Sequence, residues 1–160
     1  MTATDDEPAL LQHLDWWPDN GCFGCGPHNP HGIRLESTID DDGVTHATWT
    51  ARDHHRGPPG AVNGGVVAVP MDCQGAWTAT AAYRDRARDE GRDPATVGAV
   101  TGSYEVRLAA PTPIGVPLVL RGELLDLVDR RARVRVTTTA AGAVTATFDG
   151  VFFEVVLPAR

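Results

Sequence analysis

One stretch of small and apolar residues constrains the fold more than any other part of the chain. From about Asn63 to Glu90 the sequence is rich in alanine, valine, threonine and glycine, and it ends in the polar segment YRDRARDEGRDP. Gly91 and Pro94 then supply residues that commonly stop a helix. This pattern predicts one long buried helix, and no other segment predicts a second helix of that length.

Segments typical of β-strands flank this helix on both sides. GIRLEST and GVTHATWTAR precede it, separated by an Asp-Asp-Asp-Gly turn at residues 40–43, and their alternation predicts a hairpin. Four β-rich segments follow it, at residues 96–110, 116–127, 131–140 and 143–156. Two strands, one buried helix and four further antiparallel strands make an α+β chain whose sheet folds over the helix.

The size and charge of the chain limit its organisation and its partners. A chain of 160 residues fits one ordinary domain. We expect an irregular N-terminal segment at residues 1–31, with a short helix near 9–14, and the main domain at 32–160. The net charge of −7 argues against nucleic acid as a partner, because phosphate binding needs a basic surface.

The sequence also predicts where the protein works. The N-terminus is acidic and lacks the basic and apolar regions of a signal peptide, so we expect a cytoplasmic protein. The apolar stretch 61–82 contains Asn63, Pro70 and Asp72, which favours a buried helix over a membrane span. Three cysteines, an odd number, favour reduced thiols over a disulfide framework.

Two absences narrow the chemistry. The chain has no lysine, which removes Schiff-base chemistry and the lysine of a phosphate-binding loop. Its two serines, Ser37 and Ser103, lie outside any G-x-S-x-G motif, which argues against a serine hydrolase. No organic cofactor is implied.

Three motifs, in order along the chain, carry a family resemblance. CFGCGPHNPHGIRLE, HHRGPPGAVNGGVVAVPMD and VTGSYEVRLAAPTPIG resemble the hot-dog-fold acyl-CoA thioesterases, in particular the group related to phenylacetate-pathway and mammalian thioesterase-superfamily proteins. The resemblance covers about residues 22–155. It implies a hot-dog fold, in which an antiparallel sheet of five to six strands wraps around one long central helix. It also implies an acyl-CoA or acyl-carrier thioester as substrate and a homodimer or homotetramer as the assembly.

The resemblance assigns the first catalytic candidates. The family has His-Gly-Gly at the start of the central helix and a carboxylate seven residues after the second glycine; this chain has Asn63, Gly64, Gly65 and Asp72. The resemblance implies that Asp72 is the general base or nucleophile, and that the Gly64 N–H polarises the thioester carbonyl at a helix N-terminus. Gly64 and Gly65 leave room for that carbonyl because they have no Cβ.

The spacing of these residues predicts an oligomer. Seven residues along a helix return to nearly the same face, but about 10 Å further along the axis. Asp72 therefore cannot reach a carbonyl held at Gly64 of its own helix. As the resemblance implies, Asp72 of one subunit would face the Gly64 end of the other.

A structural role for Asp72 is the alternative. Pro70 has no N–H and would clash with the carbonyl of Val66 in an unbroken helix, so it predicts a kink or a restart of the helix there. Asp72 would then cap the restarted helix or accept hydrogen bonds from buried backbone groups.

Four other residues are candidates for the site. Asn63, in place of the family's histidine, could orient a carbonyl or simply cap the helix, but it cannot titrate near neutral pH. Thr101 matches a strand hydroxyl that orients water or substrate in relatives. His55 falls where relatives often have a histidine, and it could instead be a solvated loop residue. Gln74 could contact substrate or satisfy buried backbone groups.

The segment CFGCGPHNPHG raises the question of a metal site. Cys22, Cys25, His28 and His31 recur every three residues, and cysteine with histidine can bind zinc. Structural zinc sites usually take two ligand pairs from separated segments, whereas here one short knuckle would supply all four. A packed entry loop is therefore the preferred interpretation, and no metal is predicted.

These residues predict a thioesterase that hydrolyses an acyl-CoA or acyl-carrier thioester. A non-catalytic hot-dog protein that binds an acyl thioester or a related apolar ligand is the alternative, favoured by Asn63 and Pro70. A hydratase or dehydratase is a further rival, but those enzymes pair a carboxylate with a histidine, and Asn63 replaces the obvious histidine.

Overall fold

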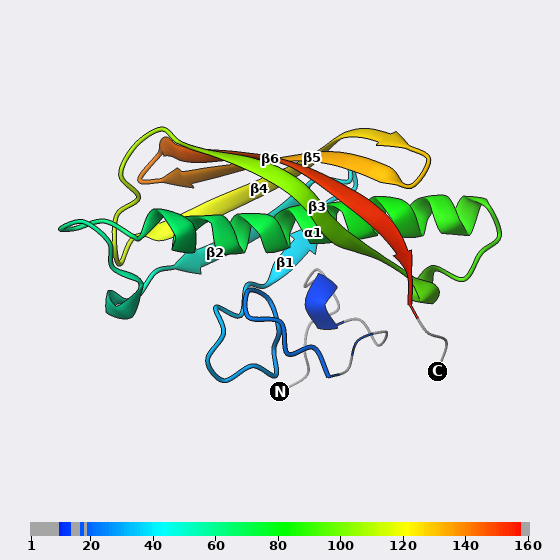
Figure 1. The fold of residues 1–160 in the computed structure, drawn as a ribbon, viewed down its shortest axis with the longest axis horizontal. Coiled ribbons are helices and arrows are strands. Elements are labelled where there is room, and N and C mark those ends of the chain that lie inside the picture. The colour runs from blue at the N-terminus through cyan, green and yellow to red at the C-terminus, as the bar shows by residue number, and fades with distance from the viewer. Residues whose placement is uncertain (1–9, 14–16, 18, 158–160) are drawn as a thin grey trace.

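The computed structural model describes residues 10–13, 17 and 19–157. One long helix, α1, lies against a six-stranded antiparallel sheet of order β1-β2-β4-β5-β6-β3, which curves over it (Figure 1). The strands are β1 (Ser37–Ile39), β2 (Thr45–Thr50), β3 (Val97–Leu108), β4 (Pro117–Val128), β5 (Arg131–Ala140) and β6 (Ala143–Val156). This arrangement confirms the predicted α+β class, the hairpin at the start and the four strands after the helix.

The helix α1 runs from Gly64 to Asp89, within one residue of each predicted end. Asn63 caps its start, because the side-chain oxygen accepts hydrogen bonds from the backbone of the first turn. Met71, Ala79 and Tyr83 are fully buried between the helix and the sheet. At Gly75 the sheet approaches the helix closely, since a Cβ there would lie 2.6 Å from Cζ of Phe152 on β6.

The structure corrects the prediction that the helix restarts at Pro70. The helix does not restart after this proline, since residues 64–89 form one continuous α-helix. Pro70 removes one hydrogen bond to the carbonyl of Val66, but its ring is buried and α1 packs against β3, β4, β5 and β6. Packing along the sheet offsets the missing bond, and Asp72 lies inside a helix rather than at the cap of one.

The described part of the N-terminal segment, residues 10–13, 17 and 19–31, packs beside α1, on the lower side of the helix in Figure 1. Leu11, Cys25, Ile33 and Leu35 are buried in the same core as the helix and the sheet. A 3-10 helix, η1 (Leu11–His13), lies within the predicted short helix at 9–14, whose first and last residues lie outside the described residues.

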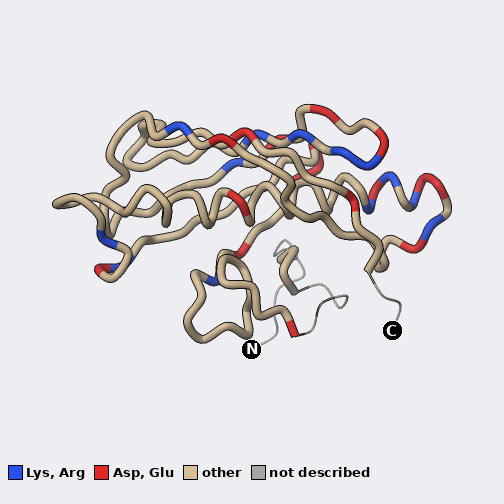
Figure 2. Tube along the Cα trace, in the orientation of Figure 1, with Lys and Arg blue, Asp and Glu red and all other residues tan. Residues whose placement is uncertain are grey.

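Charged residues of both signs are mixed along the chain. Figure 2 shows them gathered at the C-terminal end of α1 and around the β4–β5 hairpin, whereas the N-terminal part of α1 carries few. Among the residues described, no helix has the length and apolar character needed to cross a bilayer.

Candidate active site

Asp72 and Thr101 come together in the structure. The Thr101 hydroxyl donates a 2.8 Å hydrogen bond to Oδ1 of Asp72, joining the middle of α1 to β3. Asp72 is half-buried, and burial raises the pKa of its carboxyl, an effect that the hydrogen bond from Thr101 opposes. A carboxylate with one neutral donor, next to an exposed strand, is placed to accept a proton.

A β-bulge at Gly102 determines which side chains of β3 face the helix. The pairing of β3 with β6 shifts between Thr101 and Ser103, so that Gly102 is the extra residue. Without the bulge, Thr101 and Leu108 would point to opposite faces, since they are an odd number of residues apart. With it, the Thr101 hydroxyl donates to Asp72 while Leu108 packs against Gly64, so both of these side chains lie on the α1 side of β3.

The start of α1 has the geometry of an anion-binding helix end. Oδ1 of Asn63 accepts hydrogen bonds from the backbone N–H of Gly65, at 3.0 Å, and of Val66, at 3.4 Å. This cap does not take the N–H of Gly64, one of the first-turn donors that have no partner within the helix. A Cβ at Gly64 would lie 2.7 Å from Cδ1 of Leu108, so a side chain there would displace Leu108.

An apolar pocket opens beside this helix start. It has a volume of about 380 Å³, and Gly64 lies in its wall with Pro58, Val62, Val67 and Leu108. A pocket of this size and lining suits an acyl group or another apolar chain. The pocket lies at the Gly64 end of the helix, away from Asp72.

Asp72 and the Gly64 end are separated within one chain. Eight residues of helix place them about 12 Å apart along the axis. The strand that joins them, β3, is an edge of the sheet. Its residues 100–105 are all exposed, and Val100, Tyr104 and Leu108 are 48%, 52% and 54% exposed. A long exposed edge with apolar side chains is a surface on which another strand can pair.

Two predicted site residues lie apart from Asp72. The backbone carbonyl of His55 accepts the N–H of Asn63 at 2.9 Å, which places His55 at the start of α1. Its Nδ1 accepts the N–H of Arg52, so the ring proton sits on Nε2, and burial lowers its pKa, which favours the neutral ring. Gln74 is fully buried and accepts a 2.7 Å hydrogen bond from the hydroxyl of Ser37, on the side of α1 that faces β1.

Sequence reasoning missed three features around the site. The contact of Leu108 with Gly64 depends on how β3 lies against α1, and the bulge at Gly102 depends on the pairing of β3 with β6; neither has a local signal in the sequence. The third feature is Cys73, whose thiol lies 3.8 Å from that of Cys22. No local pattern in the sequence indicates that Cys73 lies beside Cys22, which is 51 residues away.

The fold has been seen in solved structures. A thioesterase superfamily protein from Shewanella loihica PV-4 matches with a TM-score of 0.60 and 30% identity, over 80% of this chain and 95% of that one. A second thioesterase superfamily protein matches with a TM-score of 0.67 and 24% identity, over 94% of this chain and 69% of that one. A protein from Streptococcus mutans UA159, bound to acetyl-CoA, matches with a TM-score of 0.63 and 15% identity, over 78% and 91%.

No protein-family model and no curated protein matches the chain. A six-stranded antiparallel sheet curved over one long helix, as in these solved structures, defines the hot-dog fold predicted from the three motifs. The chain belongs to the thioesterase superfamily, as its identity to the Shewanella protein over nearly the whole of that protein shows.

Proposed function

We propose that the protein hydrolyses an acyl-CoA or acyl-carrier thioester, with Asp72 as its general base or nucleophile. The observation that carries the proposal is the 2.8 Å hydrogen bond from Thr101 to Asp72. It fixes a half-buried carboxylate at an exposed edge of the sheet, in a protein whose superfamily is named for this reaction. The acetyl-CoA in the Streptococcus protein supports a CoA thioester as ligand.

The start of α1 is the second half of the proposed site. The N–H of Gly64 lies outside the Asn63 cap, and the positive end of the helix dipole lies behind it. A thioester carbonyl placed there would receive a hydrogen bond as its oxygen becomes negative. The apolar pocket beside Gly64 would hold the acyl chain or the pantetheine arm.

A dimer would bring the two halves of the site, Asp72 and the Gly64 end of α1, together from different copies of the chain. If β3 pairs with its own copy about a two-fold axis between Tyr104 and Glu105, then Thr101 lies opposite the partner's Leu108. Because Thr101 contacts Asp72 and Leu108 contacts Gly64, this pairing brings Asp72 to the partner's Gly64. The exposed apolar side chains of β3 support this dimer, and each dimer would have two equivalent sites.

The chemical steps follow from these positions. Asp72 takes a proton from water as the water oxygen attacks the thioester carbon, or attacks that carbon itself to form an anhydride that water then opens. The C–S bond breaks, the sulfur takes a proton, and a carboxylic acid and a free thiol leave. Asn63 supports the helix end as a cap in this scheme and moves no proton.

A binding protein without turnover is the second candidate. Asn63 favours it, because its side-chain oxygen is already occupied by two backbone donors at the position where the family has a histidine. Such a protein would hold an acyl thioester in the pocket beside Gly64 and release it unchanged.

Thiol release from short, medium, long and aromatic acyl-CoA thioesters tests the proposal. We expect turnover by the native protein and a fall of about 100-fold or more for Asp72→Asn, since loss of a general base costs about 10²–10⁴-fold. Asp89→Asn is the matched control, because Asp89 is an exposed aspartate at the far end of the same helix.

Equal turnover by Asp72→Asn and the native protein would remove Asp72 from the mechanism. Binding of an acyl-CoA without thiol release would favour the binding protein. Light scattering at micromolar concentration tests the assembly, and a monomer that still turns over substrate would contradict the shared site.

A further inference from the structure

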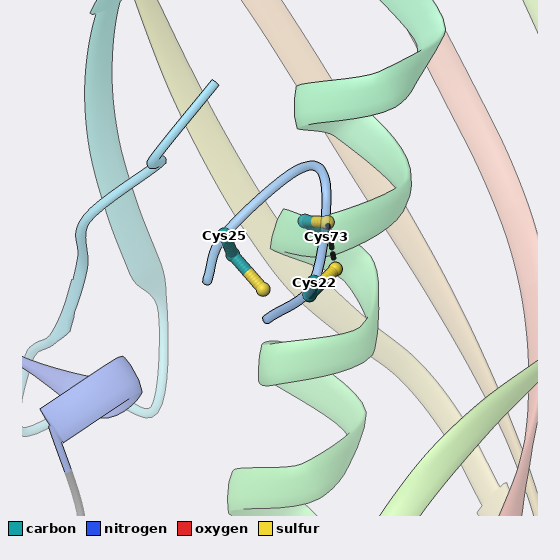
Figure 3. Close-up of side chains that lie close together, drawn as sticks. All are labelled: Cys22, Cys25 and Cys73. Carbon is teal, nitrogen blue, oxygen red and sulfur yellow. Dashed lines mark hydrogen bonds between the residues drawn. The ribbon is translucent and has the colours of Figure 1, made fainter. Parts of the chain in front are cut away.

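The three cysteines of the chain meet at one point. Cys22 and Cys25 come from the N-terminal loop, and Cys73 comes from α1, one residue after Asp72. Their three Sγ atoms lie within 4.8 Å of one another, with 3.8 Å between those of Cys22 and Cys73. Figure 3 shows the three side chains directed toward one another, from the loop and from the helix.

Two glycines allow the loop to present these thiols. A Cβ at Gly24 would lie 2.2 Å from Sγ of Cys73, so only glycine lets the loop press onto the helix at that thiol. A Cβ at Gly26 would lie 2.4 Å from the backbone nitrogen of Cys22. The loop also closes on itself, since the N–H of Gly26 donates to the carbonyl of Cys22 at 2.9 Å. Gly24 and Gly26 therefore allow a tight loop that brings Cys22 and Cys25 against Cys73 of the helix.

The spacing of the sulfurs suits a metal ion. In a tetrahedral zinc site with Zn–S bonds of about 2.3 Å, neighbouring sulfurs are about 3.8 Å apart. The Cys22–Cys73 separation already has this value, and the remaining sulfurs are within about an ångström of it. Three neutral thiols would gain little from meeting, because S–H groups are weak donors and weak acceptors.

The surroundings suit charged sulfur ligands. The indole N–H of Trp77 donates to Sγ of Cys25 at 3.2 Å, the kind of outer contact that orients a metal-bound thiolate. Cys25 and Cys73 are buried, whereas Cys22 is half-buried, which leaves an approach for the ion and a place for a fourth ligand.

We propose that Cys22, Cys25 and Cys73 form a three-thiolate site for Zn²⁺, with water as the fourth ligand. On binding, each thiol gives its proton to solvent and one Zn–S bond forms at each sulfur. The ion would tie the N-terminal loop to α1 beside Asp72, and this role is independent of the reaction proposed above. His28 and His31 of the loop are exposed and are not ligands in this set. Cys73 supplies the ligand from a separate segment.

Metal titration of the folded, reduced protein tests the site. After removal of metal with a chelator, Co²⁺ is added in the presence of a phosphine reductant. We expect a sulfur-to-cobalt charge-transfer band that saturates at one equivalent and disappears when Zn²⁺ displaces Co²⁺. Zn²⁺ should also raise the melting temperature, because it binds the folded state. Absence of both the band and the thermal shift would overturn the proposal.

Variants assign the ligands. Cys22→Ser and Cys73→Ser should each weaken Co²⁺ binding by about 100-fold or more, since even outer-shell changes cost about 10–100-fold. His28→Ala is the matched control and should bind as the native protein does. If Cys73→Ser fails to fold, Cys22→Ser still decides, because the side chain of Cys22 is only half-buried.

Native affinity in Cys22→Ser, or loss of binding in His28→Ala, would overturn the three-thiolate set, because the first result would remove Cys22 as a ligand and the second would add His28. These measurements use metal binding as their readout, so a failure here and an absence of thioesterase activity are separate results.

Discussion

Two carboxylates beside α1 are held in opposite ways. Glu154, on β6 near the C-terminal end of the helix, is paired with Arg86 and also accepts a 2.7 Å hydrogen bond from Arg92. Asp72, in the middle of the helix, has the single hydroxyl of Thr101 as its hydrogen-bond donor among the residues described. Glu154 is buried and Asp72 is half-buried, and among the residues described only Glu154 of the two has a cationic partner.

The pKa directions express this difference. Burial alone would raise the pKa of Glu154, but the hydrogen bonds from Arg92 and Arg86 bring it below its ordinary value. Burial raises the pKa of Asp72, and the hydrogen bond from Thr101 does not cancel the effect. A carboxylate saturated by arginines stabilises the fold, whereas one with a single neutral donor is available for chemistry.

The largest expected effect separates activity from stability at Asp72. Asp72→Asn should lower thioester turnover by about 100-fold or more. It should change the free energy of unfolding by less than about 0.5 kcal/mol, because the amide oxygen can still accept the hydrogen bond from Thr101 and no ion pair is lost. Turnover and denaturant unfolding of the same preparations check this. A loss of stability above 2 kcal/mol would instead make Asp72 a structural residue.

Glu154→Gln should lower stability and leave turnover unchanged, the reverse of Asp72→Asn. The amide keeps a weaker contact with the two arginines but loses the charge, at a cost of about 1.5–3 kcal/mol in the free energy of unfolding. Turnover per folded molecule should stay the same, since Glu154 lies at the other end of α1 from Gly64. Urea unfolding monitored by tryptophan fluorescence measures the loss, and unchanged stability would contradict the comparison.

Substitutions of Thr101 test whether its hydrogen bond to Asp72 contributes to turnover. Thr101→Val keeps the shape of the side chain and removes the hydroxyl, so turnover should fall by about tenfold, as expected for one lost hydrogen bond worth about 1–1.5 kcal/mol. Thr101→Ser restores a hydroxyl at the same position and is the matched control. A steady-state comparison decides: equal rates for the valine and serine variants would mean that the hydroxyl does not orient Asp72.

Whether the sequence predicts a feature depends on how far apart along the chain the interacting residues lie. The bounds of α1 follow from local signals, because Asn63 caps its start and the polar residues before Gly91 mark its end. The strands follow from alternation, and Asp72 with Thr101 came from the family resemblance. Each of these depends on residues close together in sequence or on a known pattern.

Features that depend on contacts between distant segments were missed or mispredicted. Pro70 predicted a kink or a restart of the helix, and the restart is absent because α1 packs along the sheet. The approach of Cys22 to Cys73 spans 51 residues, and only the folded loop with Gly24 against the helix reveals it. For Gln74 the sequence left substrate contact and a buried hydrogen-bonding role both open, and its hydrogen bond with Ser37 depends on a strand 37 residues away.

The smallest expected effect is the pH dependence of the Glu154 contribution. Because the folded protein holds the pKa of Glu154 below its ordinary value of 4.5, the stabilisation is present above that pH and is lost as the pH falls through the folded pKa. The stability gap between the native protein and Glu154→Gln should therefore be constant near neutral pH and shrink in acid. Asp85→Asn, at an exposed ion pair with Arg88 on α1, should leave stability within about 0.5 kcal/mol at every pH. Thermal unfolding at a series of pH values from 7 to 3 follows the gap, and a gap that persists undiminished at pH 3 would show that charge at Glu154 is not its source.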